Sequence, residues 1–248
     1  MTEVLERWAE GTGGRLRYLD SASEETVGLP VLFSPGLSDT ADEYEAAFAA
    51  LTPRRLLVVE VRGQGRSDAP PTGYSADDHV DDLEAVVEHA GLDRFHLMTF
   101  SRGTTWGIDL ARRRPSCVAS VSIGDYRAVE VGLPPTFAES QWRTRFRGRP
   151  MPDRVTFHVL EGIARESRDR DLWEALGGLG VPVLVGRGAA GGILRDADVE
   201  RYRAAVADIE VVTFDDAAHD LFRPDRTAYP RAVADFVARQ VAETGGRP

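Results

Sequence analysis

Short apolar segments alternate with segments of helical periodicity along most of the chain, and this alternation constrains the fold more than any other feature. Strand-like segments span residues 16–19, 31–34, 56–61, 95–99, 118–123, 181–186 and 209–214, whereas helical spacing marks residues 42–51, 76–90, 102–114, 197–207 and 228–241. Strands that alternate with helices usually pair in parallel and form a sheet covered on both faces. We therefore predict an α/β fold with a mostly parallel twisted sheet, in which ligands bind outside the carboxyl ends of the strands.

Residues 126–180 interrupt this alternation. The stretch is much longer than the connections of about 2 to 6 residues that are typical of α/β units. At 248 residues the chain suits one well-buried domain. We expect a core of residues 1–125 and 181–248, and a small helical cap of residues 126–180 above the strand ends, with helical pieces at 135–145, 154–166 and 171–176.

Charge and composition exclude several classes of protein. The net charge of −10 disfavours a nucleic-acid binder, because phosphate attraction requires a basic surface. No stretch approaches the roughly 20 apolar residues of a membrane helix, and residues 1–14 do not resemble a secretion signal. We expect a cytoplasmic protein with a small-molecule substrate and neither nucleic-acid nor membrane partners. The single cysteine, Cys117, excludes an internal disulfide and is predicted to pack.

The segment 95–103 (FHLMTFSRG) has the pattern of a buried strand that turns sharply through Ser101 into a helix. Gly103 stands where such a turn needs a residue without a side chain. The turn would expose the Ser101 hydroxyl and aim the backbone N–H of Arg102 at a negative charge developing on a carbonyl oxygen. Serine is also a common N-cap, so this segment alone leaves a nucleophile and a cap as alternatives.

His219 follows the last predicted strand, at the same edge of the sheet as Ser101. An imidazole is well suited to removing a proton from a serine hydroxyl near neutral pH. Two further segments precede them in the chain, Ser34-Pro35-Gly36-Leu37-Ser38-Asp39 and Val61-Arg62-Gly63-Gln64-Gly65-Arg66-Ser67-Asp68. These four features occur in the order found in the α/β-hydrolase superfamily, which the chain resembles over nearly its whole length.

The resemblance implies roles for individual residues. The first segment resembles the oxyanion loop, with Pro35 in place of the common histidine, and the second resembles the family's R-G-x-G-x-S-D turn. Ser101 matches the nucleophile of the G-x-S-x-G elbow, in which Thr99 replaces the first glycine, and His219 matches the catalytic base. The backbone N–H groups of Leu37 and Arg102 match the oxyanion hole.

The acid of the triad departs from the usual pattern. Family members usually carry it after the penultimate strand, but residues 187–194 offer glycines there. A minority place it after the strand that follows the nucleophile helix, where this chain has Asp125. We therefore predict that Asp125 orients His219. Asp196 and Asp198 are the alternatives, although caps of a helix explain them adequately.

Substrate contacts are predicted from the side chain of Arg102 and from Phe137, Trp142 and Phe146. Arg102 would either pair with an acid or hold an anionic group. The arginine run in 142–149 would either recognise a carboxylate or phosphate or form a solvated face. Structural roles are predicted for Arg62 and Asp68, and for the histidines at positions 79, 89, 96 and 158, so we expect no metal.

Together these features predict a cofactor-free serine hydrolase that cleaves an ester, lactone or thioester through an acyl-enzyme. Dehalogenases and epoxide hydrolases of the superfamily use an aspartate nucleophile, so Ser101 disfavours those activities. Carbon–carbon hydrolysis and lyase reactions use the same residues and stay open. A different hypothesis is a ligand-binding member with little turnover, motivated by Pro35 and the missing usual acid. The sequence indicates neither the natural acyl group nor the oligomeric state.

Overall fold

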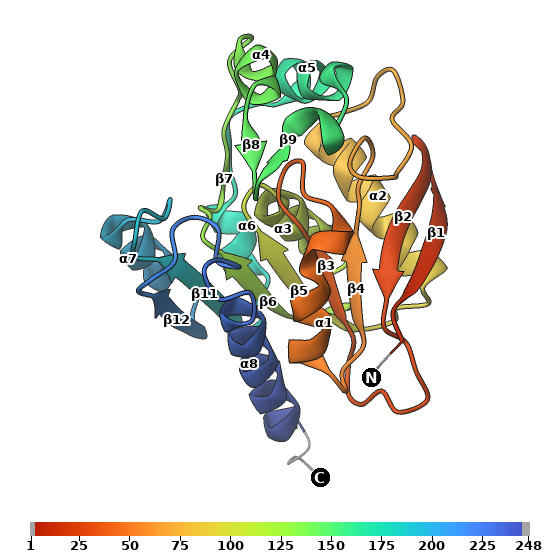
Figure 1. Cartoon of the computed structure of the whole chain (residues 1–248). Helices are drawn as coiled ribbons and strands as arrows, with labels where there is room; N and C mark the ends of the chain where they lie inside the picture. Colours follow the sequence, from red (N-terminus) through yellow and green to blue (C-terminus); the bar gives the residue numbers. More distant parts are fainter. Residues whose placement is uncertain (1–2, 245–248) are drawn as a thin grey trace.

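A single large sheet organises the molecule (Figure 1). The structure is a computed structural model that describes residues 3–244. Eight strands of this part of the chain form the sheet in the order β1-β2-β4-β3-β5-β6-β11-β12. Their bounds are β1 (Leu5–Gly11), β2 (Gly14–Asp20), β3 (Val31–Ser34), β4 (Leu56–Val59), β5 (Phe95–Phe100), β6 (Val118–Gly124), β11 (Val183–Gly188) and β12 (Ile209–Phe214). Pairing is parallel from β4 through β12, and β1 and β2 are antiparallel. The predicted α/β fold is confirmed.

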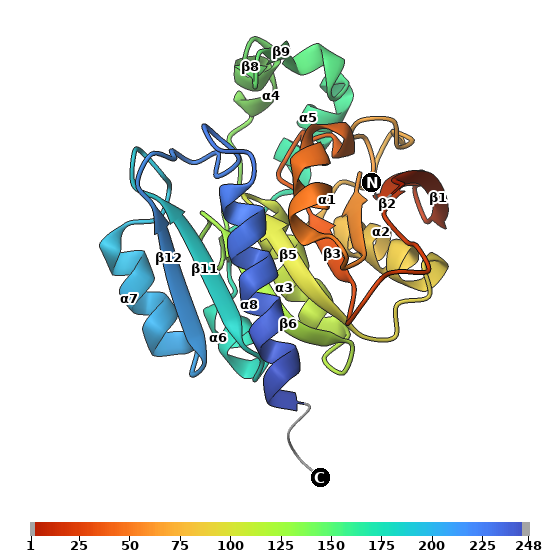
Figure 2. The same ribbon diagram turned by 60° about the horizontal axis from the view of Figure 1, so that its bottom comes forward.

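Helices cover both faces of the sheet (Figure 2). On one face lie α1 (Glu45–Leu51), which follows the 3-10 turn η1 (Ala41–Tyr44), and α8 (Ala228–Thr244). On the other lie α2 (Ala76–His89), α3 (Gly103–Arg113), α6 (Trp173–Gly178) and α7 (Asp196–Ala205). Successive side chains of a strand point to opposite faces. Val31 and Phe33 accordingly join the cluster under α1 and α8, whereas Leu32 joins the cluster under α2 and α3.

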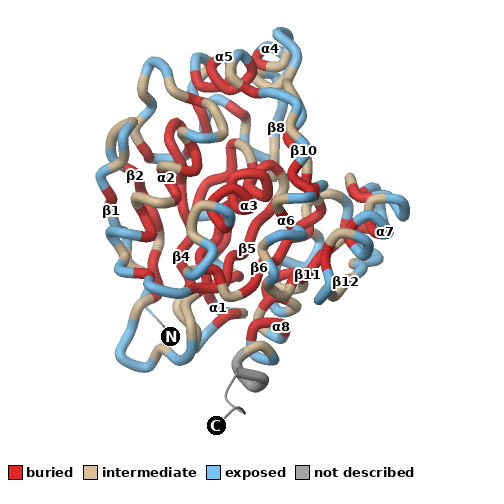
Figure 3. Tube along the Cα trace, turned by 180° about the vertical axis from the view of Figure 1, so that it is seen from behind, coloured by how far each residue is buried: buried red, intermediate tan, exposed pale blue. Residues whose placement is uncertain are grey.

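The central strands and α3 are the most deeply buried parts of the chain (Figure 3). Every residue of β5 is buried, and so are nine of the eleven residues of α3. Burial on both faces is expected for central strands of a parallel sheet, and it makes their carboxyl ends rigid supports for a site. Cys117 is half-buried against this core, as predicted.

Residues 126–180 contain more irregular structure than the sequence indicated. Their helices are α4 (Phe137–Trp142), α5 (Phe157–Glu166) and α6, with the 3-10 turn η2 (Met151–Asp153). Two-stranded ribbons join β7 (Val129–Glu130) to β10 (Arg170–Asp171) and β8 (Arg145–Phe146) to β9 (Arg149–Pro150). The predicted helix at 135–145 is shorter because the β8–β9 hairpin begins at Arg145. These strands of two residues have too little periodicity to be recognised in the sequence.

The elements of this segment lie in two places. Helices α4 and α5 and the β8–β9 hairpin lie beyond the carboxyl ends of the central strands (Figures 1 and 2). Helix α6 instead packs on α3 and α7, and its Trp173 and Leu176 belong to the main hydrophobic core. The division into a core and a cap stays a prediction.

Strand β1 was not predicted. It pairs antiparallel with β2 at the edge of the sheet, and its side chains are mostly half-buried or exposed. An edge strand of this kind lacks the continuous apolar run that marked the central strands.

Within the described residues, no helix is both long and apolar enough to cross a membrane.

Candidate active site

Ser101 occupies a strained turn between β5 and α3. Its φ angle is 50°, in the left-handed region that non-glycine residues rarely adopt. Its N–H donates to the carbonyl of Gly124 over 3.0 Å, and its own carbonyl accepts from Thr104 N–H over 2.9 Å. A Cβ atom on Gly103 would lie 2.2 Å from the carbonyl oxygen of Pro35. The turn therefore requires glycine at position 103, as the sequence predicted, because the backbone of Ser34 and Pro35 lies so close to residue 103.

Thr99 stands two residues before Ser101, where the related motif has glycine. Its hydroxyl lies 3.0 Å from that of Thr104 and donates to the carbonyl of Ser122 over 3.1 Å. Its methyl group fits because α3 has glycine at the facing position, where a Cβ atom on Gly107 would lie 2.6 Å from Thr99 Cγ2. The exchange at position 99 is thus accommodated by a gap in the facing helix.

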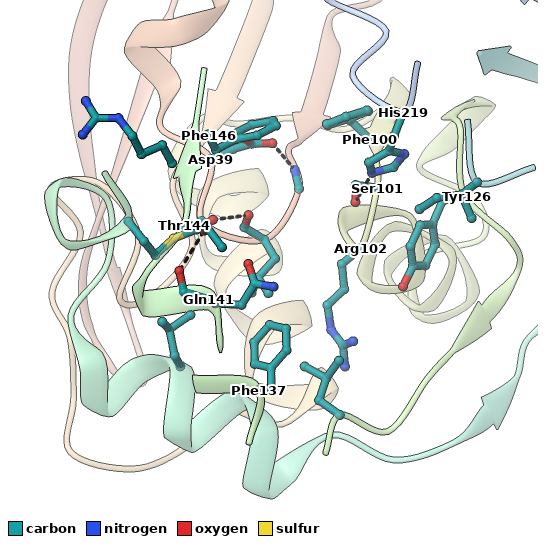
Figure 4. Close-up of a pocket in the computed structure, with 18 residues that line it drawn as sticks. Asp39, Phe100, Ser101, Arg102, Tyr126, Phe137, Gln141, Thr144, Phe146 and His219 are labelled. Carbon is teal, nitrogen blue, oxygen red and sulfur yellow. Dashed lines mark hydrogen bonds between the residues drawn. The ribbon is translucent and has the colours of Figure 1, made fainter. Parts of the chain in front are cut away.

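His219 contacts both Ser101 and Asp125 (Figure 4 shows Ser101 and His219). Its Nε2 lies 2.9 Å from Ser101 Oγ, and its Nδ1 lies 2.8 Å from Asp125 Oδ2. The ring also stacks on Phe100, with 5.1 Å between ring centroids. A carboxylate at Nδ1 keeps a proton on that nitrogen and leaves Nε2 free to accept one. This arrangement can remove the proton of the serine hydroxyl.

Asp125 is completely buried and is surrounded by backbone donors. The N–H groups of Gly188 and Ile193 donate to its carboxylate over 3.2 and 2.7 Å, with a longer contact of 3.5 Å from Leu194. Hydrogen bonds of this kind compensate for the burial of a carboxylate. The glycine-rich loop after β11, which lacks the usual acid, thus wraps around the acid that follows β6.

The two alternative acids lie elsewhere. Asp196 is 92% exposed at its side chain and pairs with Arg187 over 2.6 Å. Asp198 accepts from the N–H of Arg195 over 2.9 Å at the start of α7. Both act at the beginning of a helix, which agrees with the explanation as caps.

Leu37 and Arg102, whose backbone N–H groups are the predicted oxyanion donors, line one cavity with Ser101 (Figure 4 labels Ser101 and Arg102). Neither N–H donates to another group within residues 3–244. Buried Asp39 fixes the backbone before Leu37. It accepts from Gly36 N–H over 2.8 Å and from the Tyr44 hydroxyl over 2.6 Å. Burial raises the pKa of Asp39, although the charge of Arg147 and the hydrogen bond from Tyr44 oppose this. Two free donors beside a serine hydroxyl have the composition of an oxyanion hole.

The cavity has a volume of about 500 Å³ and a mainly apolar wall. Of the four residues predicted to contact the substrate, Phe137, Phe146 and Arg102 line this cavity and Trp142 does not. The Trp142 ring packs against Phe157 instead, at 5.4 Å between centroids. The lining residues that sequence reasoning missed include Phe100, Tyr126, Leu133, Gln141, Thr144, Met151, Leu160 and Ile193. Most of these follow Asp125 in the segment without clear periodicity, where no sequence signal pointed to them.

The side chain of Arg102 pairs with an acid, one of its two predicted alternatives. Its guanidinium donates to Glu130 over 3.0 Å and to the carbonyl of Val131 over 3.2 Å. Glu130 also accepts from Arg170, so the pair is part of a buried network. The charge of Arg102 is therefore already compensated at the cavity wall.

The arginines of 142–149 fall into different environments. Arg147 is buried and paired with Asp220, whereas Arg143 is exposed. Arg149 is exposed and contacts Thr40 and the carbonyl of Asp153. Arg145 lines the cavity and donates to the carbonyl of Gly148, but it has no carboxylate partner among the described residues. Arg145 is thus the member of the run that lines the cavity without a carboxylate partner.

Four histidines lie away from Ser101. His79 stacks on Trp106 at 4.3 Å between centroids, and burial lowers its pKa to about 4. Burial likewise lowers the pKa of His96 to about 4. His89 bonds to the Tyr18 hydroxyl, and His158 contacts Thr156. Residues 3–244 contain no group of three or more histidine, cysteine or acidic side chains arranged to hold a metal; the expectation of no metal stays a prediction.

Arg62 and Asp68 serve the turn after β4. Arg62 makes several hydrogen bonds to Asp82, the shortest of 2.6 Å, and Asp68 accepts from Arg15 N–H over 2.9 Å. Their structural assignment agrees with these contacts.

The strand order and the sharp turn at Ser101 define an α/β-hydrolase fold. The family model for the alpha/beta hydrolase fold matches residues 30–123. The chain therefore has an α/β-hydrolase fold, and residues 30–123 match the family.

Curated relatives match the chain over part of its length. Haloalkane dehalogenase 2 of Mycobacterium tuberculosis is 31% identical over 125 residues, which are 48% of this chain and 41% of that protein. The 2-(acetamidomethylene)succinate hydrolase of Mesorhizobium japonicum is 30% identical over 104 residues, which are 42% of this chain and 37% of that protein. The matches therefore span about two fifths of each relative.

Among solved structures, an esterase from Exiguobacterium antarcticum superposes with a TM-score of 0.76. The likeness covers 94% of this chain and all of that chain, at 20% sequence identity. At this identity the likeness concerns the fold alone.

Proposed function

We propose that the protein is a cofactor-free serine hydrolase that cleaves an ester, lactone or thioester of a small molecule through an acyl-enzyme. The observation that carries the proposal is the pair of contacts made by His219, with Ser101 at one ring nitrogen and Asp125 at the other. This pairing of nucleophile, base and orienting acid is recognised by geometry whatever the order in the chain.

In the proposed mechanism, His219 Nε2 removes the hydroxyl proton as Ser101 Oγ attacks the substrate carbonyl. Asp125 stabilises the imidazolium that forms, and the N–H groups of Leu37 and Arg102 donate to the oxyanion. His219 then gives its proton to the leaving group, which departs and leaves the acyl-enzyme. Water, deprotonated by His219, attacks the acyl carbon, and His219 then returns the proton to Ser101 Oγ as the bond to the acyl group breaks and the acid is released.

We further propose that the substrate carries an anionic group remote from the reacting carbonyl. The cavity wall offers apolar surface from Phe137 and Phe146 and one uncompensated cation, Arg145. The other arginine of the cavity, Arg102, pairs with Glu130. The carboxylate of Asp39 has Arg154 as its partner of opposite charge. A guanidinium suits recognition of a carboxylate or phosphate. Segment 126–180 would then act as a cap that supplies specificity.

Two other functions use the same residues. Carbon–carbon hydrolysis needs the same base and oxyanion donors, and product analysis separates it from ester cleavage. A ligand-binding protein with little turnover would not need a buried carboxylate on the histidine. The contact of Asp125 with His219 therefore favours the enzyme.

The first test labels the protein with a fluorophosphonate, which reacts with activated serines whatever the natural substrate. The wild type should be modified at Ser101, and Ser101→Ala should not. A panel of chromogenic esters, lactones and thioesters then measures turnover. Ser101→Ala should abolish it, and Asp125→Asn should lower kcat by about 10⁴-fold, as loss of an orienting acid does in a triad.

Asp196→Asn is the matched control, because it removes the exposed alternative acid and should leave turnover unchanged. Activity that survives Ser101→Ala would refute the serine mechanism. Tight binding of the panel without turnover or labelling would establish the ligand-binding alternative.

A further inference from the structure

Arg147, at the tip of the β8–β9 hairpin, forms an ion pair with Asp220, the residue that follows His219. Its Nε and Nη2 donate to the two carboxylate oxygens of Asp220 over 2.8 and 2.7 Å. Its Nη1 also lies 3.5 Å from a carboxylate oxygen of Glu43. The side chain is only 3% exposed although its backbone forms a turn. A bidentate contact of this kind fixes the orientation of the carboxylate as well as its position.

Aromatic rings enclose the same guanidinium. Its central carbon lies 4.9 Å from the ring centre of Tyr44, 4.8 Å from that of Phe146 and 5.4 Å from that of Phe222. Cation–π attraction adds to the ion pair, and exclusion of water strengthens both. Burial alone would raise the pKa of Asp220, but the hydrogen bonds and charge of Arg147 hold it below its ordinary value. The pair therefore stays charged at neutral pH.

The backbone of Arg147 has an unfavourable conformation. Its φ is 50°, and Gly148 follows with φ 80°. Two-residue hairpin turns with positive φ at both positions strongly prefer Asn, Asp or Gly. The left-handed region is unfavourable for a residue with a Cβ atom. An arginine here is consistent with a side chain whose buried contacts offset that cost.

Besides the contacts of the His219 ring and a hydrogen bond of 3.2 Å from Phe222 N–H to Asp220 Oδ1, the backbone around His219 makes few hydrogen bonds. Neither the backbone N–H nor the carbonyl of His219 is hydrogen-bonded to another part of the described chain. Backbone bonds of the loop instead involve Ala217, which donates to Phe214 and accepts from Ala190, and Asp220, whose carbonyl accepts from Arg223. Asp220 is the next residue after His219, so its anchoring limits how far the imidazole can move.

We infer that Arg147 is a positioning residue for the base: by holding Asp220, it keeps His219 within reach of both Ser101 and Asp125. The inference rests on the proposed function, because it concerns the same histidine. Arg147 does not line the cavity, so it acts through Asp220 and not on the substrate. The contact also joins segment 126–180 to the histidine loop, across 73 residues of sequence.

The test compares Arg147→Met, which keeps apolar bulk but loses the donors, with Arg147→Lys, which keeps the charge but loses the paired donors. Arg149→Met is the matched control, since Arg149 lies on the same hairpin and contacts neither Asp220 nor the cavity. Displacement of a reacting group by about 1 Å can cost about 10²-fold in rate. We expect Arg147→Met to lower kcat by about that factor with KM unchanged, Arg147→Lys to recover part of the loss, and Arg149→Met to match the wild type.

The pH profile of kcat/KM supplies a readout that a purely structural role would not move. The acidic groups near His219 are Asp125 at its Nδ1, Asp220 next in the chain, and Asp215 and Asp216 earlier in the loop. Asp220 in turn faces Arg147 and Arg223, and Glu43 lies on the far side of Arg147.

Arg147→Met removes the nearer of the two cations that face Asp220, which favours the imidazolium and should move the acidic limb to higher pH. Asp220→Asn removes the negative charge next to His219, while Arg147 keeps the more distant Glu43, and should move that limb to lower pH. The double variant should return the limb toward its wild-type position.

The inference is overturned if kcat is unchanged in Arg147→Met, if KM rises while kcat is constant, or if activity falls only in proportion to the folded fraction in thermal melts. If Arg147→Met does not fold, Arg147→Lys and Asp220→Asn make the same comparison of kcat and pH limb. Labelling of Ser101 by the fluorophosphonate separates the two failures: without it the proposed function and this inference fall together, and with it an unaffected Arg147→Met refutes the inference alone.

Discussion

Gly192 lies so close to Asp125 that a Cβ atom on the glycine would be 2.6 Å from Asp125 Oδ1. The same Cβ would be 2.4 Å from the carbonyl oxygen of Gly188. The loop after β11 can therefore close over the buried carboxylate only with glycine at this position. Where the resemblance to the superfamily led us to expect an acid, the chain has instead a loop that donates backbone N–H groups to an acid from β6.

We predict that Gly192→Ala lowers kcat/KM by about 10- to 10²-fold, because the added methyl group must displace either the Asp125 carboxylate or the loop that solvates it. Overpacking of this kind also costs about 1–3 kcal/mol of stability. Steady-state kinetics and denaturant unfolding measure the two effects. Gly178→Ala is the control, since nothing lies within 4 Å of its added Cβ. Normal activity in Gly192→Ala would show that the loop yields without moving Asp125.

Thr99 and Gly107 form a second complementary pair, in which the helix glycine makes room for the threonine methyl group. Gly107→Ala should destabilise the protein by about 1–3 kcal/mol. Thr99→Ser removes the clashing methyl but keeps the hydroxyl that contacts Thr104 and Ser122. In the Gly107→Ala background it should therefore restore stability. A double-mutant cycle by urea unfolding gives the coupling, and additive effects would contradict this account.

Sequence reasoning was most effective where burial is continuous. The strands β3, β4, β5, β6, β11 and β12 were recognised because their apolar runs are bounded by turns, and two of them, β3 and β12, have the predicted limits. Edge strand β1 and the ribbons of residues 126–180 were missed, since exposed or two-residue strands leave no such pattern.

The site shows the same contrast. Ser101, His219 and Asp125 follow strand ends in a parallel sheet, so their common location could be predicted from strand order. Two contacts could not, because they depend on side-chain packing across long sequence separations: the pairing of Arg147 with Asp220, and the turning of Trp142 onto Phe157. Which arginines of 142–149 are paired, exposed or at the cavity could likewise not be predicted from the sequence. A cytoplasmic location stays a prediction.

His79 should make stability fall as the pH decreases. Burial lowers its pKa from 6.5 to about 4, so between these values the unfolded chain binds a proton that the folded chain does not. Stability is therefore lost progressively as the pH falls below about 6.5, and the loss from this group is about 2 kcal/mol between pH 7 and pH 5. His79→Phe keeps a ring against Trp106 and should flatten the pH dependence of urea unfolding by that amount.

His158→Phe is the control for this experiment, because His158 is exposed on α5. It should leave the slope of stability against pH as in the wild type. An unchanged slope in His79→Phe would mean that His79 is readily protonated in the folded protein.

Arg145 should discriminate between charged and neutral substrates. The comparison uses a chromogenic half-ester of adipate, which carries a carboxylate, and the corresponding neutral ester of hexanoate. Arg145→Gln should raise KM for the half-ester about tenfold, since a charge-assisted hydrogen bond contributes about 1.5–3 kcal/mol before solvent exposure reduces it. KM for the hexanoate ester should change by less than about twofold, because the apolar wall formed by Phe137 and Phe146 is intact.

Arg143→Gln supplies the matched control, because it removes an exposed arginine of the same run that does not line the cavity. If both substitutions raise KM for the half-ester equally, the attraction is the general field of the run and not a contact inside the cavity, and added salt should then weaken it strongly. If only Arg145→Gln acts, and kcat is retained, the guanidinium binds the remote carboxylate without entering the chemistry at Ser101. A preference for the neutral ester in the wild type would contradict the proposal of an anionic substrate, because the one uncompensated charge of the described cavity wall would then contribute nothing to binding.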